Sequence, residues 1–342
     1  MPGRWLRIVT DSEVYNGKTQ RSPAHTPQVL AAINWLKDKE YLTTVDQRRI
    51  IQRNRRQDHL PQAYALTQKW FDQVSGSTLS TKAEVSRNKN SSYVQVRIED
   101  GGRKKRKVSI PLSNFTNDAD RSVIHESNKL LSRYDEIMSK ATIKLEDKEI
   151  FPSQTSMTRI FSRGSLAKGG RFYHSLQSLK KSQRLKLRVN DQPVIEMDYS
   201  SMHPCLLYEA NGLCLEGDAY DIDGFERDQV KVAFNVLINR DHEIHKKTEA
   251  QSISTATNLS VVQARKLREL IYEKHDAVKH HFNVGYGLHL QKMDSEIALR
   301  VIDYFVNKAR RPIIMIHDSA IVAYTDVQTL FYCMRDCYYD VL

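Results

Sequence analysis

The sequence predicts an α+β fold in which a small antiparallel sheet is flanked by helices. Two apolar runs predict the sheet: residues 194–197 form one that ends at Asp198, and 313–316 form another that opens on a turn with Asp318 at its tip. Apolar residues that recur at helical spacing, as they do over 120–141, predict the helices. Each Asp therefore lies where a rigid strand ends.

The composition limits the partners that this chain can have. It has 342 residues, of which 40% are hydrophobic, so a sizeable core is expected. A net charge of +11 favours a polyanionic partner, with nucleic acid ahead of an anionic membrane surface. Neither a bilayer-crossing apolar run nor the apolar core of a signal peptide is visible, which predicts an intracellular protein, cytoplasmic, nucleoid or virus-associated, with no membrane partner.

Residues 1–150 are expected to form a mainly helical region that carries one basic hairpin. A Thr26-Pro27 pair begins a predicted helix, residues 93–98 and 107–112 alternate like two paired strands, and an Asp-Gly-Gly turn joins them. The turn carries four cations that could grip a nucleic-acid backbone: Arg103, Lys104, Lys105 and Arg106. A charged edge that prevents aggregation explains the same residues equally well.

The two strand-borne carboxylates are the first candidate site. If one sheet brings Asp198 and Asp318 side by side, they can hold two Mg²⁺ ions about 3.5–4 Å apart, with Mn²⁺ as a substitute. Taken singly, either residue is better explained as a turn or cap residue, and only the other motifs of the chain favour the metal site. The four cysteines form no CxxC pair, so neither a zinc site nor a disulfide framework is predicted.

A predicted helix over 227–239 carries the second candidate site. Arg227, Lys231, Asn235 and Asn239 are spaced four apart and therefore share one helical face. Two cations and two amides in such a stripe can bind a triphosphate and the sugar or base beside it. The alternative is a solvated surface stripe.

Three further stretches bear on nucleic-acid contact. Residues 168–173 combine glycines, cations and aromatics as a phosphate-binding loop does, although a generic basic loop is the alternative. Ser260 and Gln263 form a capping box that begins another helix. The histidines at 275, 280 and 281 lack zinc-ligand spacing and are assigned to the surface or to nucleic-acid contact.

In this order, the motifs resemble the superfamily of the family A DNA polymerases and the single-subunit RNA polymerases of phages and mitochondria. Asp198-Tyr-Ser and His317-Asp-Ser are similar to its two metal-binding motifs, and the Arg227, Lys231 and Asn239 spacing resembles its fingers helix. Gly170, Arg171 and Tyr173 resemble the Gly-Arg-x-Tyr loop of the RNA polymerases. The segment from Gln291 to Ser295, which includes Asp294, lies where the enzymes of this superfamily contact the primer end and the template. The resemblance covers roughly 155–342.

The resemblance implies a right-hand polymerase. Residues 151–342 would form the palm and helical fingers, the fingers at about 215–290, and 1–150 a thumb-like or accessory region able to dock a protein partner. Asp198 and Asp318 would hold two Mg²⁺ ions, while Lys231 and Arg227 grip an NTP or dNTP and Tyr199 adjoins it. Nucleotides would be added to a primer or to an initiating nucleotide on a nucleic-acid template.

The departures from that pattern concern sugar selection and size. Asn239 replaces a tyrosine, and His203 stands where the DNA polymerases have glutamate and the RNA polymerases glycine. An imidazole there either excludes the ribose or hydrogen-bonds to it. The His317-Asp-Ser motif and the upstream loop favour an RNA product slightly over DNA, and the short chain favours a minimal, primase-like or specialised enzyme. A two-metal nuclease and a non-catalytic nucleic-acid-binding protein are the rival interpretations.

Overall fold

The computed structural model describes residues 6–8, 34–45, 62–66, 69, 91–100, 106–146, 148–150, 152–243 and 247–341. Its contacts divide the chain into two compact units, Met1–Glu84 and Val85–Leu342. The smaller unit contains an antiparallel sheet of three strands, in the order β1 (Leu6–Ile8), β3 (Gln62–Leu66) and β2 (Leu42–Val45). Residues 34–38 are helical, as predicted for the end of the helix that begins near Thr26; its beginning lies outside the described residues.

The first sheet of the larger unit has four strands in the order β5 (Arg106–Ile110), β4 (Val94–Asp100), β8 (Thr158–Ser162) and β9 (Ser165–Tyr173). Strands β4 and β5 pair antiparallel, which confirms the two strands of the predicted hairpin. Strand β4 pairs parallel with β8, so the sheet is mixed. The predicted basic residues Arg103, Lys104 and Lys105 lie outside the described residues, and Arg106 is the first residue of β5.

The second sheet is a six-stranded antiparallel half-barrel, and it carries both predicted acidic strands. Its order is β12 (Ile314–Ile316), β13 (Ser319–Ala323), β11 (Gln192–Asp198), β10 (Leu187–Val189), β6 (Ile143–Leu145) and β7 (Lys148–Ile150). The α+β fold class predicted from the sequence is confirmed.

The helices of the larger unit include the long amphipathic ones that the apolar spacing predicts. In chain order they are η2 (Leu112–Asn114), α4 (Asp118–Lys140), α5 (Pro152–Thr155), η3 (Ser175–Ser178), α6 (Lys181–Arg184), α7 (Met202–Glu209), α8 (Arg227–Asn239), α9 (Glu249–Thr257), α10 (Val261–Lys274), η4 (Asp276–His281), α11 (Gly287–Asp303), the π-helical η5 (Tyr304–Ala309), η6 (Tyr324–Asp326) and α12 (Val327–Tyr339). The capping box predicted for α10 is present, because Ser260 Oγ accepts from the Gln263 amide at 3.2 Å.

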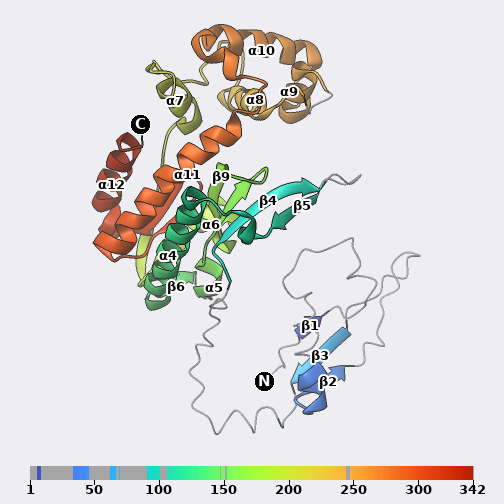
Figure 1. Ribbon diagram of the computed structural model, residues 1–342, viewed down its shortest axis with the longest axis vertical. Coiled ribbons are helices and arrows are strands. Elements are labelled where there is room, and N and C mark those ends of the chain that lie inside the picture. The colour runs from blue at the N-terminus through green and yellow to red at the C-terminus, as the bar shows by residue number, and fades with distance from the viewer. Residues whose placement is uncertain are drawn as a thin grey trace, which may run out of the picture. The chain divides into compact units, whose positions relative to one another are not determined.

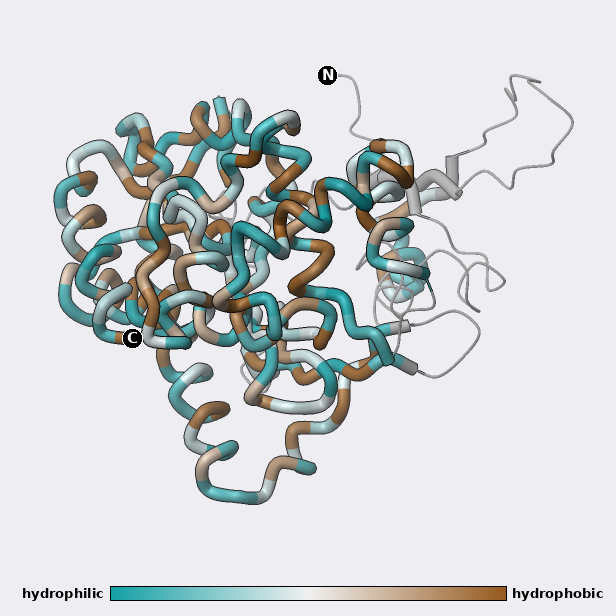
Figure 2. The backbone as a smooth tube through the Cα atoms, turned by 90° about the horizontal axis from the view of Figure 1, so that it is seen from above, coloured by the Kyte–Doolittle hydropathy of each residue, from teal (hydrophilic) through white to brown (hydrophobic). Residues whose placement is uncertain are grey.

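Helix α11 lies at the centre of the larger unit (Figure 1). It contacts β9, α7, α8 and α12, and its buried apolar residues Leu290, Ile297, Val301 and Ile302 join the main core. Helices α8, α9 and α10 pack on one another beyond one end of α11. Hydrophobic residues alternate with hydrophilic ones along the chain, as amphipathic elements around a shared core require (Figure 2).

The N-terminal region differs from its prediction in two ways. Residues 85–150 belong to the larger unit, because β4 pairs with β8 and the Tyr134 hydroxyl of α4 donates to the Ile313 carbonyl at 2.9 Å. The compact units therefore divide between 84 and 85, whereas the sequence placed the division at 150. The described part of 1–150 also contains strands β1 to β7 beside α4, so it is mixed rather than mainly helical. Within the described residues, no helix has the length and apolarity needed to cross a membrane.

Candidate active site

The register of the central strands brings the two predicted carboxylates together. Strands β11 and β13 pair antiparallel with Asp198 opposite Ser319, and the Tyr199 amide donates to the Asp318 carbonyl at 3.4 Å. Asp318 occupies the tip of the two-residue turn between β12 and β13, as predicted. His317 precedes it with φ of +57°, a left-handed conformation that closes this turn.

The charges of these side chains act on one another. Burial raises the pKa of Asp198 above its ordinary value, and the neighbouring Asp318 carboxylate raises it further. Lys231 and Lys181 oppose this rise, so both lysines lie close enough to stabilise the ionised carboxylate. The cluster therefore concentrates negative charge at a strand end and the adjacent turn, with two lysines nearby that partly offset it.

A buried ion pair supports the ends of these strands. The Arg184 guanidinium bonds to both oxygens of Glu196, at 3.0 and 2.6 Å, and Ser319 Oγ donates to Glu196 at 2.9 Å. Since Glu196 lies two residues before Asp198 on β11, both side chains are on one face of the strand. Glu196 is thereby engaged in holding β11 against β13, and its bonds to Arg184 and Ser319 lower its pKa despite partial burial.

Arg171, Asp294 and His203 form a second polar cluster beside the carboxylates. Arg171 on β9 makes an ion pair with Asp294 on α11, with Nε at 3.1 Å from Oδ2. His203, at the start of α7, places Nε2 at 2.8 Å from the same Oδ2 and at 3.0 Å from Arg171 Nη2. Burial lowers the pKa of Arg171, but the hydrogen bond and charge of Asp294 outweigh it, and the charge of Asp318 adds to the rise.

Gly170 allows β9 to approach α11 closely enough for this cluster to form. Its φ is +88°, and a Cβ there would lie 2.8 Å from Phe161 Cε1 and 2.9 Å from Ser295 Oγ. The buried Arg159 donates to the Gly170 carbonyl at 3.0 Å and forms an ion pair with Glu296 of α11 at 2.6 Å. Glycine is therefore required at 170 both for its backbone conformation and for the contact.

Helix α8 has the predicted bounds and presents Lys231 to the carboxylates. Arg227 lies at its start, where its Nε bonds Asp218 at 2.6 Å and its guanidinium covers the Tyr220 ring at 5.2 Å. At the other end, Asn239 donates to the Asn235 carbonyl at 2.8 Å. Of the predicted stripe, only Lys231 acts on the pKa of Asp198.

Asn239 also packs tightly against α11. A Cβ at Gly287 would overlap with Asn239 Oδ1, so the missing side chain at 287 makes room for this contact. The stripe of α8 therefore ends against the first residue of α11.

The remaining predicted residues differ in how they face the site. The Tyr173 and His317 rings meet edge to face at 5.7 Å beside Asp318, and burial lowers the pKa of His317. Gln291 is half-buried on α11, about one helical turn before the buried Asp294. Tyr199 points elsewhere, because its hydroxyl donates to the Met334 carbonyl of α12 at 2.6 Å, which leaves only its backbone at the site.

The assignment of His275 to the surface is wrong. Its side chain is fully buried, accepts from the Tyr208 hydroxyl at 3.0 Å and donates to the Ala219 carbonyl at 3.1 Å. The rings of Phe234 and Phe282 meet it edge-on. A single histidine in an apolar helical pattern carries no sequence signal that separates a core position from a surface position.

Sequence reasoning missed three residues that support the site: Glu196, Arg159 and Lys181. The alternation of β11 could have found Glu196, since it lies two residues from Asp198. No local pattern identifies Arg159 or Lys181, because their partners lie far along the chain.

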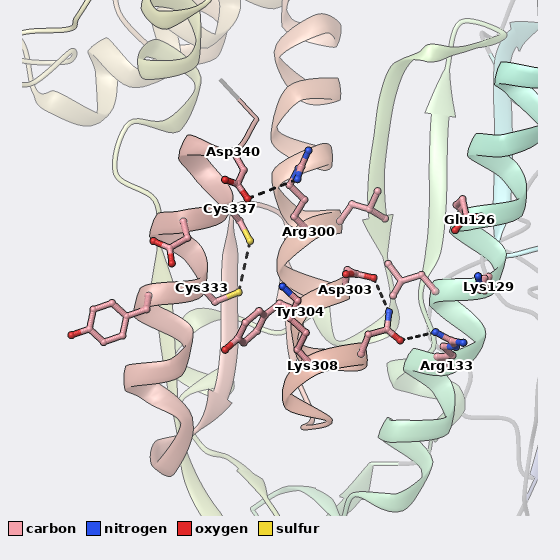
Figure 3. A pocket seen from close by; sticks show the side chains of 15 residues that line it. Glu126, Lys129, Arg133, Arg300, Asp303, Tyr304, Lys308, Cys333, Cys337 and Asp340 are labelled. Carbon is pink, nitrogen blue, oxygen red and sulfur yellow. Dashed lines mark hydrogen bonds and ion pairs between the residues drawn. The ribbon is translucent and has the colours of Figure 1, made fainter.

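A separate pocket of about 750 Å³ lies between α4, the α11–η5 segment and α12 (Figure 3). Charged side chains of both signs line it, and Asp303, Asn307 and Arg133 form a hydrogen-bonded chain across it at 2.7 and 2.8 Å. Cys333 and Cys337 meet on its α12 side at 3.8 Å between their sulfurs. None of the predicted site residues lines this pocket, so it is distinct from the carboxylate cluster.

The chemistry of the carboxylate cluster fits a hard divalent cation. Burial and the neighbouring Asp318 carboxylate raise the pKa of Asp198, and a positive ion between the two acids would stabilise the ionised form. Mg²⁺ prefers such oxygen ligands together with substrate phosphates. Within the described residues, no group of three or more His, Cys, Asp or Glu side chains is arranged to hold a metal ion.

Comparison with known proteins assigns no family to this chain. No protein-family model matches the chain, and no curated protein sequence matches it significantly.

Proposed function

We propose that this protein is a template-directed nucleic-acid polymerase, with a right-hand palm built on the half-barrel and fingers that include α8. The main support is the meeting of Asp198, Asp318 and Lys231 from three separate elements. A strand end and an adjacent turn present the acids, while helix α8 presents a cation close enough to lower the pKa of Asp198. This combination suits a phosphoryl transfer in which a triphosphate is gripped and a metal pair is held.

In the proposed reaction, a 3′-hydroxyl attacks the α-phosphorus of an incoming nucleotide. The new O–P bond forms as the bond to the bridging oxygen of the β-phosphate breaks, the hydroxyl proton passes to solvent, and pyrophosphate leaves. Lys231 binds the triphosphate, and Arg227, held by Asp218 at the start of α8, extends the cationic surface along the helix. Asp198 and Asp318 would hold two Mg²⁺ ions, or Mn²⁺, which when bound neutralise the phosphate charge and lower the pKa of the attacking hydroxyl.

The position of His203 supports a role in sugar recognition. Its Nε2 donates to Asp294, which fixes the ring rather than leaving it to rotate, and His203 lies five residues after Asp198. A fixed imidazole has a second ring nitrogen that can exchange a hydrogen bond with a ribose 2′-hydroxyl. This favours RNA as the product, with DNA as the alternative in the same site.

A two-metal nuclease explains the carboxylates but not the cation of α8. Hydrolysis of a phosphodiester needs no grip on a triphosphate, whereas Lys231 is directed at the carboxylates from the helix whose stripe the sequence singled out. A non-catalytic nucleic-acid-binding protein would need neither acid.

The test is extension of a labelled primer on DNA and on RNA templates, with NTPs and dNTPs supplied separately and with Mg²⁺ or Mn²⁺. The parent should extend the primer, and Asp198→Ala and Asp318→Ala should each abolish extension. Lys231→Ala should lower kcat/KM for the nucleotide by about 10²-fold, as the loss of one electrostatic contact to the reacting phosphates does.

Lys266→Ala is the matched control, because Lys266 is an exposed lysine on the neighbouring helix α10. It should behave as the parent. If the parent shortens the primer and the two Asp substitutions abolish this shortening, the protein is a nuclease instead. If it binds the primer–template without changing the primer length, it is a non-catalytic nucleic-acid-binding protein.

A further inference from the structure

Four aromatic rings form a row on the larger unit that the proposed chemistry does not use. His280 and His281 end η4, Tyr286 precedes α11, and His289 lies in its first turn. Successive ring centroids are 4.1, 4.1 and 4.9 Å apart, with interplanar angles of 42°, 39° and 47°. The two end rings are exposed and the two inner rings are partly exposed.

This row differs from the buried aromatic cluster nearby. In the core, Phe234 meets His275 and Phe282 edge-on, at 65° and 88° and at centroid distances of 5.1 and 5.5 Å. The rings of the exposed row lie closer together and more nearly face to face. Edge-on packing fills a core, whereas exposed, face-inclined rings offer a surface on which a further flat ring can stack.

The row begins where the α8 stripe ends. The Asn283 amide donates to the Leu237 carbonyl at 2.8 Å and the Gly285 amide to the Arg240 carbonyl at 2.7 Å, so the chain before Tyr286 is fastened to the end of α8. Asn239 packs on Gly287, the residue after Tyr286. Since a helix rises 1.5 Å per residue, Lys231 and Asn239 are about 12 Å apart along α8, roughly the length of three to four stacked nucleotides.

The charges around the row suit a nucleic acid. Arg163 of the β8–β9 turn reaches this segment, since its Nη1 would lie 3.6 Å from a Cβ at Gly285. Its Nη1 is paired with the mostly buried Asp241 at 3.4 Å, and 38% of the Arg163 side chain stays exposed. Burial lowers the pKa of His281, and the charges of His280 and His289 lower it further, which keeps this inner ring neutral near pH 7. Flat rings with a partly exposed cation near Gly285 provide stacking and backbone contact together.

We propose that the aromatic row of His280, His281, Tyr286 and His289 binds the unpaired bases of single-stranded nucleic acid by stacking, and that the occupant is the template strand as it approaches the carboxylate cluster. The identification of that strand as a template rests on the proposed polymerase function. The stacking of single-stranded nucleic acid on the row does not. Because every base has a π-face, the row accepts any sequence.

The test compares the binding of three labelled DNAs by fluorescence anisotropy: a single strand, a primer–template with a 5′ overhang, and a blunt duplex. Tyr286→Ala and His289→Ala should each weaken binding of the single strand and of the overhang about fivefold or more, and leave the blunt duplex unchanged. Tyr286→Phe keeps the ring and should bind as the parent. His125→Ala, a change of an exposed histidine on α4, is the matched control.

A fluorescent base analogue, 2-aminopurine, locates the contact. Placed singly along the template overhang, it should change its emission most at three to five nucleotides beyond the primer end, and Tyr286→Ala should remove the change. The inference is overturned if the alanine variants lose as much affinity for the blunt duplex as for the single strand, or if neither alanine variant loses affinity for the single strand. If the variants lose single-strand binding while the parent incorporates no nucleotide, the row stands as a single-strand site and the polymerase proposal fails.

Discussion

Asp198 ends strand β11 directly opposite Ser319 on β13, and this register brings its carboxylate beside that of Asp318. The two acids come from distant parts of the sequence, and burial together with the Asp318 carboxylate raises the pKa of Asp198. Such an arrangement stores electrostatic repulsion in the absence of a bound cation, and that repulsion predicts opposite effects on stability and on activity.

The substitution Asp198→Asn should abolish nucleotide incorporation yet stabilise the fold in metal-free buffer. Removing one of two like charges should raise the melting temperature by about 1–2 °C. In the parent, saturating Mg²⁺ should raise the melting temperature as well, and Asp198→Asn should respond less. Differential scanning fluorimetry with and without Mg²⁺ measures both effects; a lower melting temperature in the metal-free variant would show that Asp198 has a structural role instead.

Gly170→Ala should destabilise the protein by about 2–4 kcal/mol. The added Cβ meets Phe161 and Ser295 at 2.8 and 2.9 Å, and the φ of +88° is unfavourable for alanine. The expected readout is the free energy of unfolding from urea titration, together with loss of activity as β9 shifts from α11.

Gly217→Ala is the matched control for this substitution. Gly217 has a φ of +68°, but a Cβ there meets nothing within 4 Å, so only the backbone cost of about 1 kcal/mol is expected. Equal losses of stability in the two variants would show that the close approach of β9 to α11 contributes nothing.

His203→Ala should reduce discrimination between ribose and deoxyribose. The ring is held at Nε2 by Asp294, and its removal takes away the group positioned to recognise the 2′-hydroxyl. The ratio of kcat/KM for NTP to that for dNTP should fall about tenfold. Asp294→Asn, which leaves the imidazole but weakens its support, should lower the ratio less; an unchanged ratio in His203→Ala would exclude the histidine from sugar recognition.

His275 should make the protein lose stability as the pH falls below 6.5. Burial lowers the pKa of His275 from 6.5 to about 4, so the unfolded chain takes up a proton at a pH where the folded chain does not. The stabilisation is complete above pH 6.5, declines between 6.5 and 4, and changes no further below 4. Between pH 7 and pH 5 this residue should account for about 2 kcal/mol of lost stability.

Urea denaturation at pH 7 and pH 5 measures this loss. His275→Gln retains a donor for the Ala219 carbonyl and cannot titrate, so the pH dependence should shrink by about the same 2 kcal/mol even though the variant is less stable at pH 7. A pH dependence equal to that of the parent would assign it to other groups.

The individual elements of the larger unit were largely predictable from local pattern. The apolar run before Asp198 became β11, the four-residue spacing from Arg227 became α8 with its predicted bounds, and the Ser260 capping box begins α10. These features depend on side-chain periodicity and on hydrogen bonds within four residues, and such interactions are present in the sequence itself.

Local residue patterns were enough to predict the α+β class, the strand ends that carry Asp198 and Asp318, and the helix that carries Lys231. Long-range packing established four further features: His203 is held by Asp294, the side chain of Tyr199 faces α12, His275 is buried, and residues 85–150 belong to the larger unit. Each of these features depends on partners that are distant in the chain. Strand register and helix packing select those partners, and no local pattern of residue types encodes that selection.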